Sequence, residues 1–229
     1  MIENYKNSAL QYFSELSKKI NEYKIEPKNL SNNSLVHKEL SQNVLISDIV
    51  SLNVQDEMKL GKDASLYYSI ACPNFHCDFI FDHPLDHYSF MLIIELGRQM
   101  SIGITHKYKN FPIDSIKNTV SNMDLKIHSF VELDYPLILG CIDKIEKSKP
   151  TMQIRSLHLY FVQNGKLCAE IKSAISVMSD DLYYRYRINN RRSTVGHEDV
   201  NLITNLDMIN KQKQQTYHAK KEQTCYSDL

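Results

Sequence analysis

The sequence predicts an α+β protein in which an antiparallel sheet surrounds one buried helix. The segment at about 88–107 is apolar almost all round, which is typical of a helix enclosed by other structure. It is followed by two alternating apolar runs, Met152–Val162 and Leu167–Val177, which flank Asn164-Gly165, the usual signal for a two-residue hairpin turn. A helix and then several consecutive strands indicate an antiparallel meander packed on that helix.

The N-terminal part is predicted to contain a helix, a linker and two strands. Residues 4–22 carry apolar side chains at helical intervals, which predicts a short amphipathic helix packed on the domain or on a partner. These side chains are Leu10, Phe13, Leu16 and Ile20. Residues 25–35 are rich in turn formers and predict a linker. Strands are expected at about 36–52 and 65–72.

The second half is predicted to be mainly β-structure. Ser89 is the expected N-cap of the central helix, with Asp86 as an alternative start one turn earlier. Further strands are expected within 125–147, where Pro136 marks a bend or an edge. From 182 onward the chain is basic and then polar, which predicts a solvated tail. The expected organisation is an N-terminal helix and linker at 1–34, a main domain at 35–182 and a basic and polar tail at 183–229.

Composition and charge exclude several classes of protein. Lys and Arg total 27, as do Asp and Glu, so the net charge is zero and nucleic acid is not an expected partner. No apolar run of secretory length follows the N-terminus, and the stretch Phe90–Ile94 is far too short to span a membrane. Five cysteines without regular spacing predict reduced thiols in the cytoplasm. Cys72, His76 and Cys77 lie close together but lack the further ligands that a metal needs, so no metal or other cofactor is expected.

The polar side chains in the middle of the central helix are the first candidates for chemistry. Glu95, Arg98 and Gln99 are spaced by three and four residues, which places them on one face. A charged group on a buried helix is costly unless it is paired or faces a wet cavity. Two interpretations follow. Glu95 and Arg98 form an ion pair on a solvated stripe or at a subunit interface, or this face borders a substrate cavity in which Glu95 acts as general acid or base.

The loop before this helix holds a second polar cluster. It contains Asp82, His83, Asp86 and His87 within six residues, directly before Ser89. Amides at a helix N-terminus favour an anion or a polarised carbonyl oxygen, so a loop histidine there could act on a bound acyl group. We expect His83 in that catalytic role and Asp82, His87 and Ser89 as substrate contacts. The alternative is capping and turn formation by the two aspartates, with one histidine exposed.

An apolar central helix followed by a meander suggests the hotdog fold, a curved antiparallel sheet wrapped around that helix. Three strings of residues then resemble one family with this fold, the A-factor biosynthesis (AfsA-like) hotdog family. Leu35–Asp48 (LVHKELSQNVLISD) resembles its opening signature, and Phe81–Gln99 (FDHPLDHYSFMLIIELGRQ) looks like its central helix motif. Gly103–Tyr108 (GITHKY) resembles the continuation of that helix. The match in order and spacing spans roughly residues 35–180, and the string at 81–99 is specific.

The resemblance implies an enzyme whose helix N-terminus faces the carbonyl of an acyl thioester. Better-known family members join a β-ketoacyl group, delivered on acyl carrier protein, to dihydroxyacetone phosphate. Transesterification and intramolecular condensation then give a butenolide phosphate, the precursor of γ-butyrolactone signals. Carried onto this chain, Glu95 becomes the candidate acid or base, Arg98 holds the phosphate or a developing negative charge, and Gln99 orients substrate or the Glu95 carboxylate.

The sequence departs from the family in carrying one helix motif, where family members usually carry two hotdog halves in one chain. A C2 homodimer is therefore expected to supply the second half, with the N-terminal helix as a clasp across it. Acidic acyl carrier protein is expected to dock on a basic patch at Arg185, Arg187, Arg191 and Arg192, or at Lys107 and Lys109. Two alternatives stay open: another hotdog acyl-thioester enzyme, either a 3-hydroxyacyl dehydratase or a thioesterase, and a non-catalytic acyl-binding or regulatory subunit.

Overall fold

A computed structural model describes residues 2–25, 27, 29–53, 63–74 and 85–195 of the chain. The chain divides into two compact units, residues 1–180 and 181–229. The first unit contains the helices α1 (Ile2–Glu22) and α2 (Phe90–Tyr108) and two short 3-10 turns, η1 (Ser34–Val36) and η2 (Ser41–Asn43). Its strands are β1 (Val50–Leu52), β2 (Ala64–Ile70), β3 (Ile116–Ile127), β4 (Ile138–Lys149), β5 (Met152–Gln163) and β6 (Lys166–Ser179). Helix α3 (Asp180–Val195) begins at the boundary between the two units.

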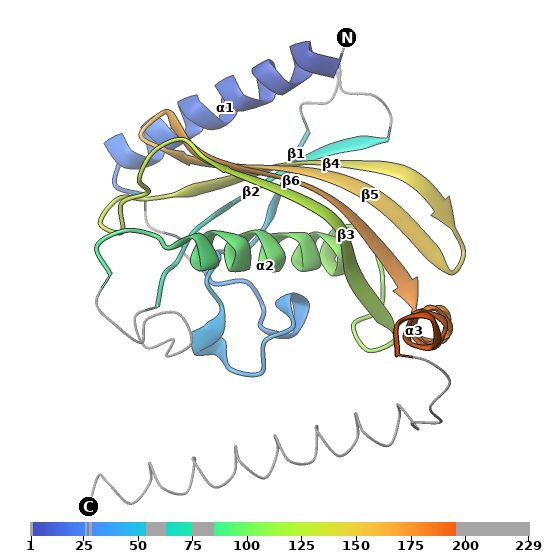
Figure 1. Ribbon diagram of the computed structural model, residues 1–229. Helices are drawn as coiled ribbons and strands as arrows, with labels where there is room; N and C mark the ends of the chain where they lie inside the picture. Colours follow the sequence, from blue (N-terminus) through green and yellow to red (C-terminus); the bar gives the residue numbers. More distant parts are fainter. Residues whose placement is uncertain (1, 26, 28, 54–62, 75–84, 196–229) are drawn as a thin grey trace, which may run out of the picture. The chain divides into compact units, whose positions relative to one another are not determined.

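The described strands form one antiparallel sheet in the order β1-β2-β4-β5-β6-β3. Helix α2 runs along one face of this sheet and α1 lies across the other, so the first unit has three layers (Figure 1). Buried side chains of α2 join apolar residues on the inner face of the sheet, such as Leu159 and Phe161, in one hydrophobic core. This is the α+β arrangement that the sequence predicted. No helix in the described ranges is both long and apolar enough to cross a bilayer.

Helix α2 confirms the predicted central helix at 88–107. Ser89 is its N-cap, because the Ser89 hydroxyl accepts a hydrogen bond from the Leu92 amide at 3.3 Å. Gly97 faces the sheet, where an added Cβ would lie 3.2 Å from Cδ1 of Ile171. The small residue therefore lets the helix approach the sheet closely. Lys107 lies in the last turn, where a positive charge complements the helix dipole.

The hairpin predicted around Asn164-Gly165 is also confirmed. Asn164 and Gly165 both have positive φ, 45° and 78°, which is the backbone that a type I′ turn requires. The turn pairs Gln163 with Lys166, and a β-bulge between Phe161 and Val162 then shifts the register so that Leu159 pairs with Ile171. As a result Leu159 and Ile171 both face α2, whereas His158 and Glu170 lie in the other row of side chains.

Helix α1 is a layer of the main unit rather than a separate element. It buries Ala9, Phe13 and Ile20 against the outer face of the sheet. The Phe13 ring lies over Gly140 of β4, where an added Cβ would come within 2.3 Å of Phe13 Cδ2. The predicted helix at 4–22 is therefore present, but it packs on its own chain and belongs to the same unit as the sheet. Packing on the domain was one of its two expected positions, and the expected clasp across a dimer stays a prediction.

The prediction of a strand over 36–52 is wrong for most of that segment. The chain there forms η2 and a stretch in which Val44, Leu45 and Ile46 are all buried, and only Val50–Leu52 is a strand. Consecutive burial means that both sides of this segment are covered, so alternation could not identify its backbone. Two further elements extend beyond their predicted ranges. β3 starts at 116, whereas the sequence predicted strands only from about 125. The start was missed because this edge strand is half-exposed and polar. Residues 180–195 form α3, where a solvated tail was expected.

A charged pair lies inside the core beneath the C-terminal half of α2. Arg155 of β5 donates from Nε to Oδ1 of Asp143 at 2.9 Å, and both side chains are fully buried. Arg155 Nη1 also donates to Thr105 Oγ1 on α2 at 2.7 Å, and Lys109 Nζ lies 3.3 Å from Asp143 Oδ2. Because a buried charge is tolerated only when paired, these contacts fix β4, β5 and α2 together.

Candidate functional site

The three predicted polar residues of α2 lie together, as their spacing indicated. The chain that follows η1, residues 37–45, covers them, and we call it the covering segment. Arg98 donates from Nε to Glu95 Oε2 at 2.7 Å and from Nη2 to Oε1 at 2.9 Å. Lys38 Nζ lies 2.8 Å from the same Oε1, and Gln99 Nε2 donates to it at 2.9 Å. We refer to Lys38, Glu95, Arg98 and Gln99 as the carboxylate cluster. The Glu95 side chain is 14% exposed, against 37% for Arg98 and 22% for Lys38, so the two cations lie nearer the solvent.

These contacts fix the protonation state of Glu95. Burial by itself raises the pKa of this carboxyl group, because desolvation penalises the charged form. The hydrogen bonds from Arg98, Lys38 and Gln99 outweigh burial and lower the pKa to about 2. Glu95 is therefore an anion at neutral pH, and it accepts hydrogen bonds rather than offering a proton.

Gln99 connects the helix to the covering segment. Its side chain is fully buried, its Oε1 accepts from the Leu45 amide at 2.9 Å, and its Nε2 donates to the Asn43 carbonyl at 2.9 Å as well as to Glu95. Both amide protons are thus in use within the protein. The hydrogen bond to Glu95 agrees with the predicted role of orienting that carboxylate, and the predicted contact of Gln99 with substrate stays a prediction.

A histidine pair lies farther along the same face of α2. His106 Nδ1 is 2.9 Å from the Phe111 carbonyl oxygen, and its Nε2 is 2.8 Å from Nε2 of His37. His37 follows η1 with left-handed backbone angles, φ 54° and ψ 51°. The residues on either side of it contact the carboxylate cluster, because Arg98 Nη2 reaches the Val36 carbonyl at 3.5 Å and Lys38 binds Glu95. The histidine pair and the carboxylate cluster are therefore neighbouring parts of one site.

The loop before α2 only partly tests the second predicted cluster. Asp82 and His83 lie outside the described residues, so their catalytic and binding roles stay predictions. His87 Nδ1 is 2.6 Å from Asp86 Oδ1. The backbone of His87 also forms an isolated antiparallel β-bridge with that of Glu132. The hydrogen bond from His87 lowers the pKa of the exposed Asp86 carboxyl. Ser89 caps the helix, and no contact among the described residues joins it or His87 to Glu95.

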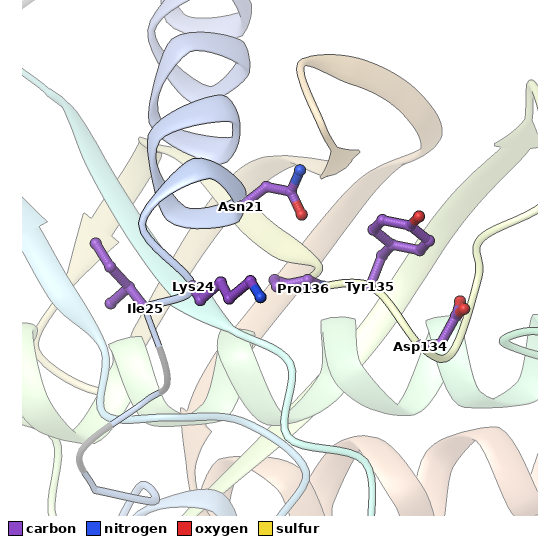
Figure 2. Close-up of a pocket in the computed structure, with 6 residues that line it drawn as sticks. All are labelled: Asn21, Lys24, Ile25, Asp134, Tyr135 and Pro136. Carbon is purple, nitrogen blue, oxygen red and sulfur yellow. The ribbon is translucent and has the colours of Figure 1, made fainter.

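A recess of about 400 Å³ lies elsewhere, between the end of α1 and the turn that leads into β4. Figure 2 shows Asn21, Lys24 and Ile25 on one side and Asp134, Tyr135 and Pro136 on the other. No residue of the carboxylate cluster lines it. This recess is partly open, and none of the predicted site residues that the structure describes lines it, so it is separate from the candidate site.

Sequence reasoning missed Lys38, His37 and His106 as site residues. His106 continues the helical series that begins at Glu95, eleven residues earlier and so three turns away on the same face. That periodicity was a readable signal. The spacing of His37 and Lys38 gave no such signal, because only tertiary packing brings their irregular segment against α2.

Comparison with known proteins identifies the family. A model of the A-factor biosynthesis hotdog domain matches residues 27–179. Among solved structures the chain is similar to a hot-dog-like protein from Thermanaerovibrio acidaminovorans, with 12% identity, a TM-score of 0.41 and coverage of 61% of this chain and 97% of that chain. It is also similar to a mutant thioesterase from Pseudomonas aeruginosa, with 8% identity, a TM-score of 0.34 and coverage of 57% and 81%. A comparison with curated protein sequences finds no match.

The TM-scores are low, so the assignment rests on other findings. The family match spans most of the chain and includes the described sheet together with α2. The antiparallel sheet that encloses α2 is the architecture that this family's fold predicts. The chain therefore belongs to the A-factor biosynthesis hotdog family.

Proposed function

We propose that the protein condenses a β-ketoacyl group, delivered as a thioester on acyl carrier protein, with dihydroxyacetone phosphate to give a butenolide phosphate. The observation that carries this proposal is the charge of the carboxylate cluster. Lys38 and Arg98 contribute two positive charges against the single negative charge of Glu95, which leaves a net charge of +1 at a partly exposed position. Such a cluster is suited to an anionic substrate group.

Arg98 is the residue that binds the phosphate in this proposal. Its Nε and Nη2 hydrogen bonds to Glu95 hold the guanidinium plane, and its Nη1 has no hydrogen-bond partner among the described residues. Lys38 uses one of its three ammonium protons on Glu95 and keeps the others for a ligand. Glu95 acts by positioning both cations, and the family match supports a thioester as the second substrate.

The ionised state of Glu95 favours this reaction over dehydration. A carboxyl group that donates a proton to a leaving hydroxyl must itself be protonated at the working pH. With a pKa of about 2, Glu95 holds no proton at neutral pH. Transfer to a hydroxyl needs no acid at this position, because the departing thiol is already a good leaving group.

In this proposal the enzyme is a C2 homodimer joined along β3. This edge strand runs for 12 residues and pairs only with β6 among the described strands. Val120, Met123 and Ile127 on it are 61%, 44% and 54% exposed, an unusual amount of apolar surface for an unprotected edge. Sedimentation should show a dimer at micromolar concentration, and Val120→Asp should shift it to monomer. A wild-type monomer with full activity would contradict the dimer.

The reaction itself is tested by incubating the protein with β-ketoacyl carrier protein and dihydroxyacetone phosphate and measuring products by mass. We expect a butenolide phosphate and free carrier thiol in equal amounts. Release of the free acid alone would indicate a thioesterase, and a 2-enoyl product from a 3-hydroxyacyl substrate would indicate a dehydratase. Binding of the acyl group without turnover would indicate the non-catalytic subunit.

Arg98 provides the matched variants for the phosphate role. Arg98→Gln should raise the KM for dihydroxyacetone phosphate by about tenfold or more, because a charge-assisted hydrogen bond contributes about 1.5–3 kcal/mol. Arg98→Lys keeps the charge and should recover part of the loss. The KM for the acyl carrier substrate should stay nearly constant in both variants. Equal changes in both KM values would contradict phosphate binding by Arg98.

A further inference from the structure

The histidine pair beside the carboxylate cluster has a defined arrangement of protons. The Phe111 carbonyl can only accept, so its contact with His106 at 2.9 Å requires a proton on His106 Nδ1. In a neutral His106 ring, Nε2 is then an acceptor. His37 Nε2, 2.8 Å away, must donate to it. This leaves His37 Nδ1 as an unprotonated ring nitrogen, and Nδ1 has no hydrogen-bond partner among the described residues.

The surroundings keep His37 neutral. Burial lowers the pKa of His37, and electrostatic interactions with the neighbouring His106, Arg98 and Lys117 lower it further. Asp114 is the one charged group that opposes this shift. His37 is exposed, whereas His106 is buried, so of the two histidines His37 is the one that a ligand can contact.

The backbone also constrains His37. Its left-handed conformation is uncommon for residues other than glycine, although asparagine, aspartate and histidine adopt it more often than most. The η1 turn ends there, with the His37 amide donating to the Ser34 carbonyl at 3.2 Å. This conformation places Lys38 on Glu95 while His37 turns to His106. His106 thus orients His37, and the Phe111 carbonyl orients His106. Many enzymes activate a hydroxyl nucleophile with a base that is held in this way by a second and a third group.

We infer that His37 Nδ1 is the general base of the transfer step and that His106 is the positioning residue that fixes its tautomer. The inference rests on the proposed function, because the hydroxyl it deprotonates is that of the phosphorylated triose held by Arg98. His37 Nδ1 accepts the hydroxyl proton as the oxygen forms a bond to the thioester carbon. The carbon–sulfur bond then breaks, its electron pair goes to sulfur, and His37 returns the proton to give the free thiol.

His37→Asn is the variant for the base, because asparagine accepts left-handed backbone angles and so preserves the turn. We expect kcat to fall by about a hundredfold or more, the usual contribution of a general base. The acidic limb of the pH profile of kcat/KM should disappear with it. His128→Asn, which changes a half-exposed histidine at the end of β3, is the matched control and should retain wild-type kinetics. A His37→Asn protein with at least half of the wild-type kcat would overturn the inference.

His106 is tested by a pair of variants. His106→Phe keeps a ring but removes the acceptor, so we expect kcat to fall about tenfold with KM unchanged. His106→Gln offers an amide oxygen to His37 and should restore most of the loss, whereas a merely structural role would give no such rescue. If His106→Phe fails to fold, the His106→Gln kinetics and the imidazole ¹⁵N spectrum below still decide the assignment.

The imidazole ¹⁵N spectrum of the wild-type protein reports the tautomers directly at neutral pH. We expect the proton of His106 on Nδ1 and that of His37 on Nε2. The opposite tautomers, or a charged His37, would overturn the inference whatever the kinetics. The expected tautomers in a protein that makes no butenolide would instead count against the proposed function, so the two failures are distinguishable.

Discussion

Replacement of Glu95 by Gln removes the one negative charge of the carboxylate cluster while keeping the size of the side chain. The cluster lowers the pKa of Glu95 from its ordinary value of 4.5 to about 2. This difference corresponds to about 3 kcal/mol of stabilisation of the folded protein at neutral pH. We therefore expect Glu95→Gln to lower the free energy of unfolding at pH 7 by about 3 kcal/mol. Because the folded-state pKa is depressed, this stability is present above pH 4.5 and is lost as the pH falls toward 2.

Urea unfolding followed by far-UV circular dichroism can measure this effect at several pH values. At pH 3.5 the wild type should already have lost about 1.4 kcal/mol of the stabilisation that the ionised Glu95 provides. The difference in free energy of unfolding between the wild type and Glu95→Gln should therefore be roughly halved. Glu39→Gln, on the exposed part of the same covering segment, should change stability by less than about 0.5 kcal/mol. A Glu95→Gln protein as stable as the wild type at pH 7, or a gap that does not narrow with acid, would refute the assigned role of the cluster.

Three further predictions concern the layers of the domain and its carrier partner. Gly140→Ala should lower the free energy of unfolding by about 1–3 kcal/mol, since the new Cβ meets the Phe13 ring; unchanged stability would show that α1 is not packed there. Arg155→Met should cost about 3–5 kcal/mol in urea unfolding because it leaves Asp143 buried without its main partner, and an added Asp143→Leu should recover part of this; no recovery would contradict the pairing. Arg185→Glu should raise the KM for the acyl carrier substrate, as should added salt; kinetics insensitive to salt would exclude electrostatic docking.

The local elements of this fold could be predicted from sequence because their signals are local. Asn164-Gly165 determines its turn through backbone angles that few other residue pairs adopt, and this turn joins β5 to β6 as an antiparallel hairpin. The uninterrupted apolar surface of α2 required burial, and Ser89 fixed where the helix begins. The spacing of Glu95, Arg98 and Gln99 is by itself enough to place them on one face of the helix.

Tertiary structure decided which of these residues lie together in the candidate site and what surrounds each of them. The segment after η1 has no periodicity, because it is covered on both sides, so its sequence could not show that Lys38 binds Glu95 or that His37 meets His106. Glu95 was expected to serve as an acid or base, yet its protonation state depends on two cations and an amide that only folding brings around it. Spacing along a helix is a property of the chain, whereas the pKa of a carboxyl group is a property of everything packed against it.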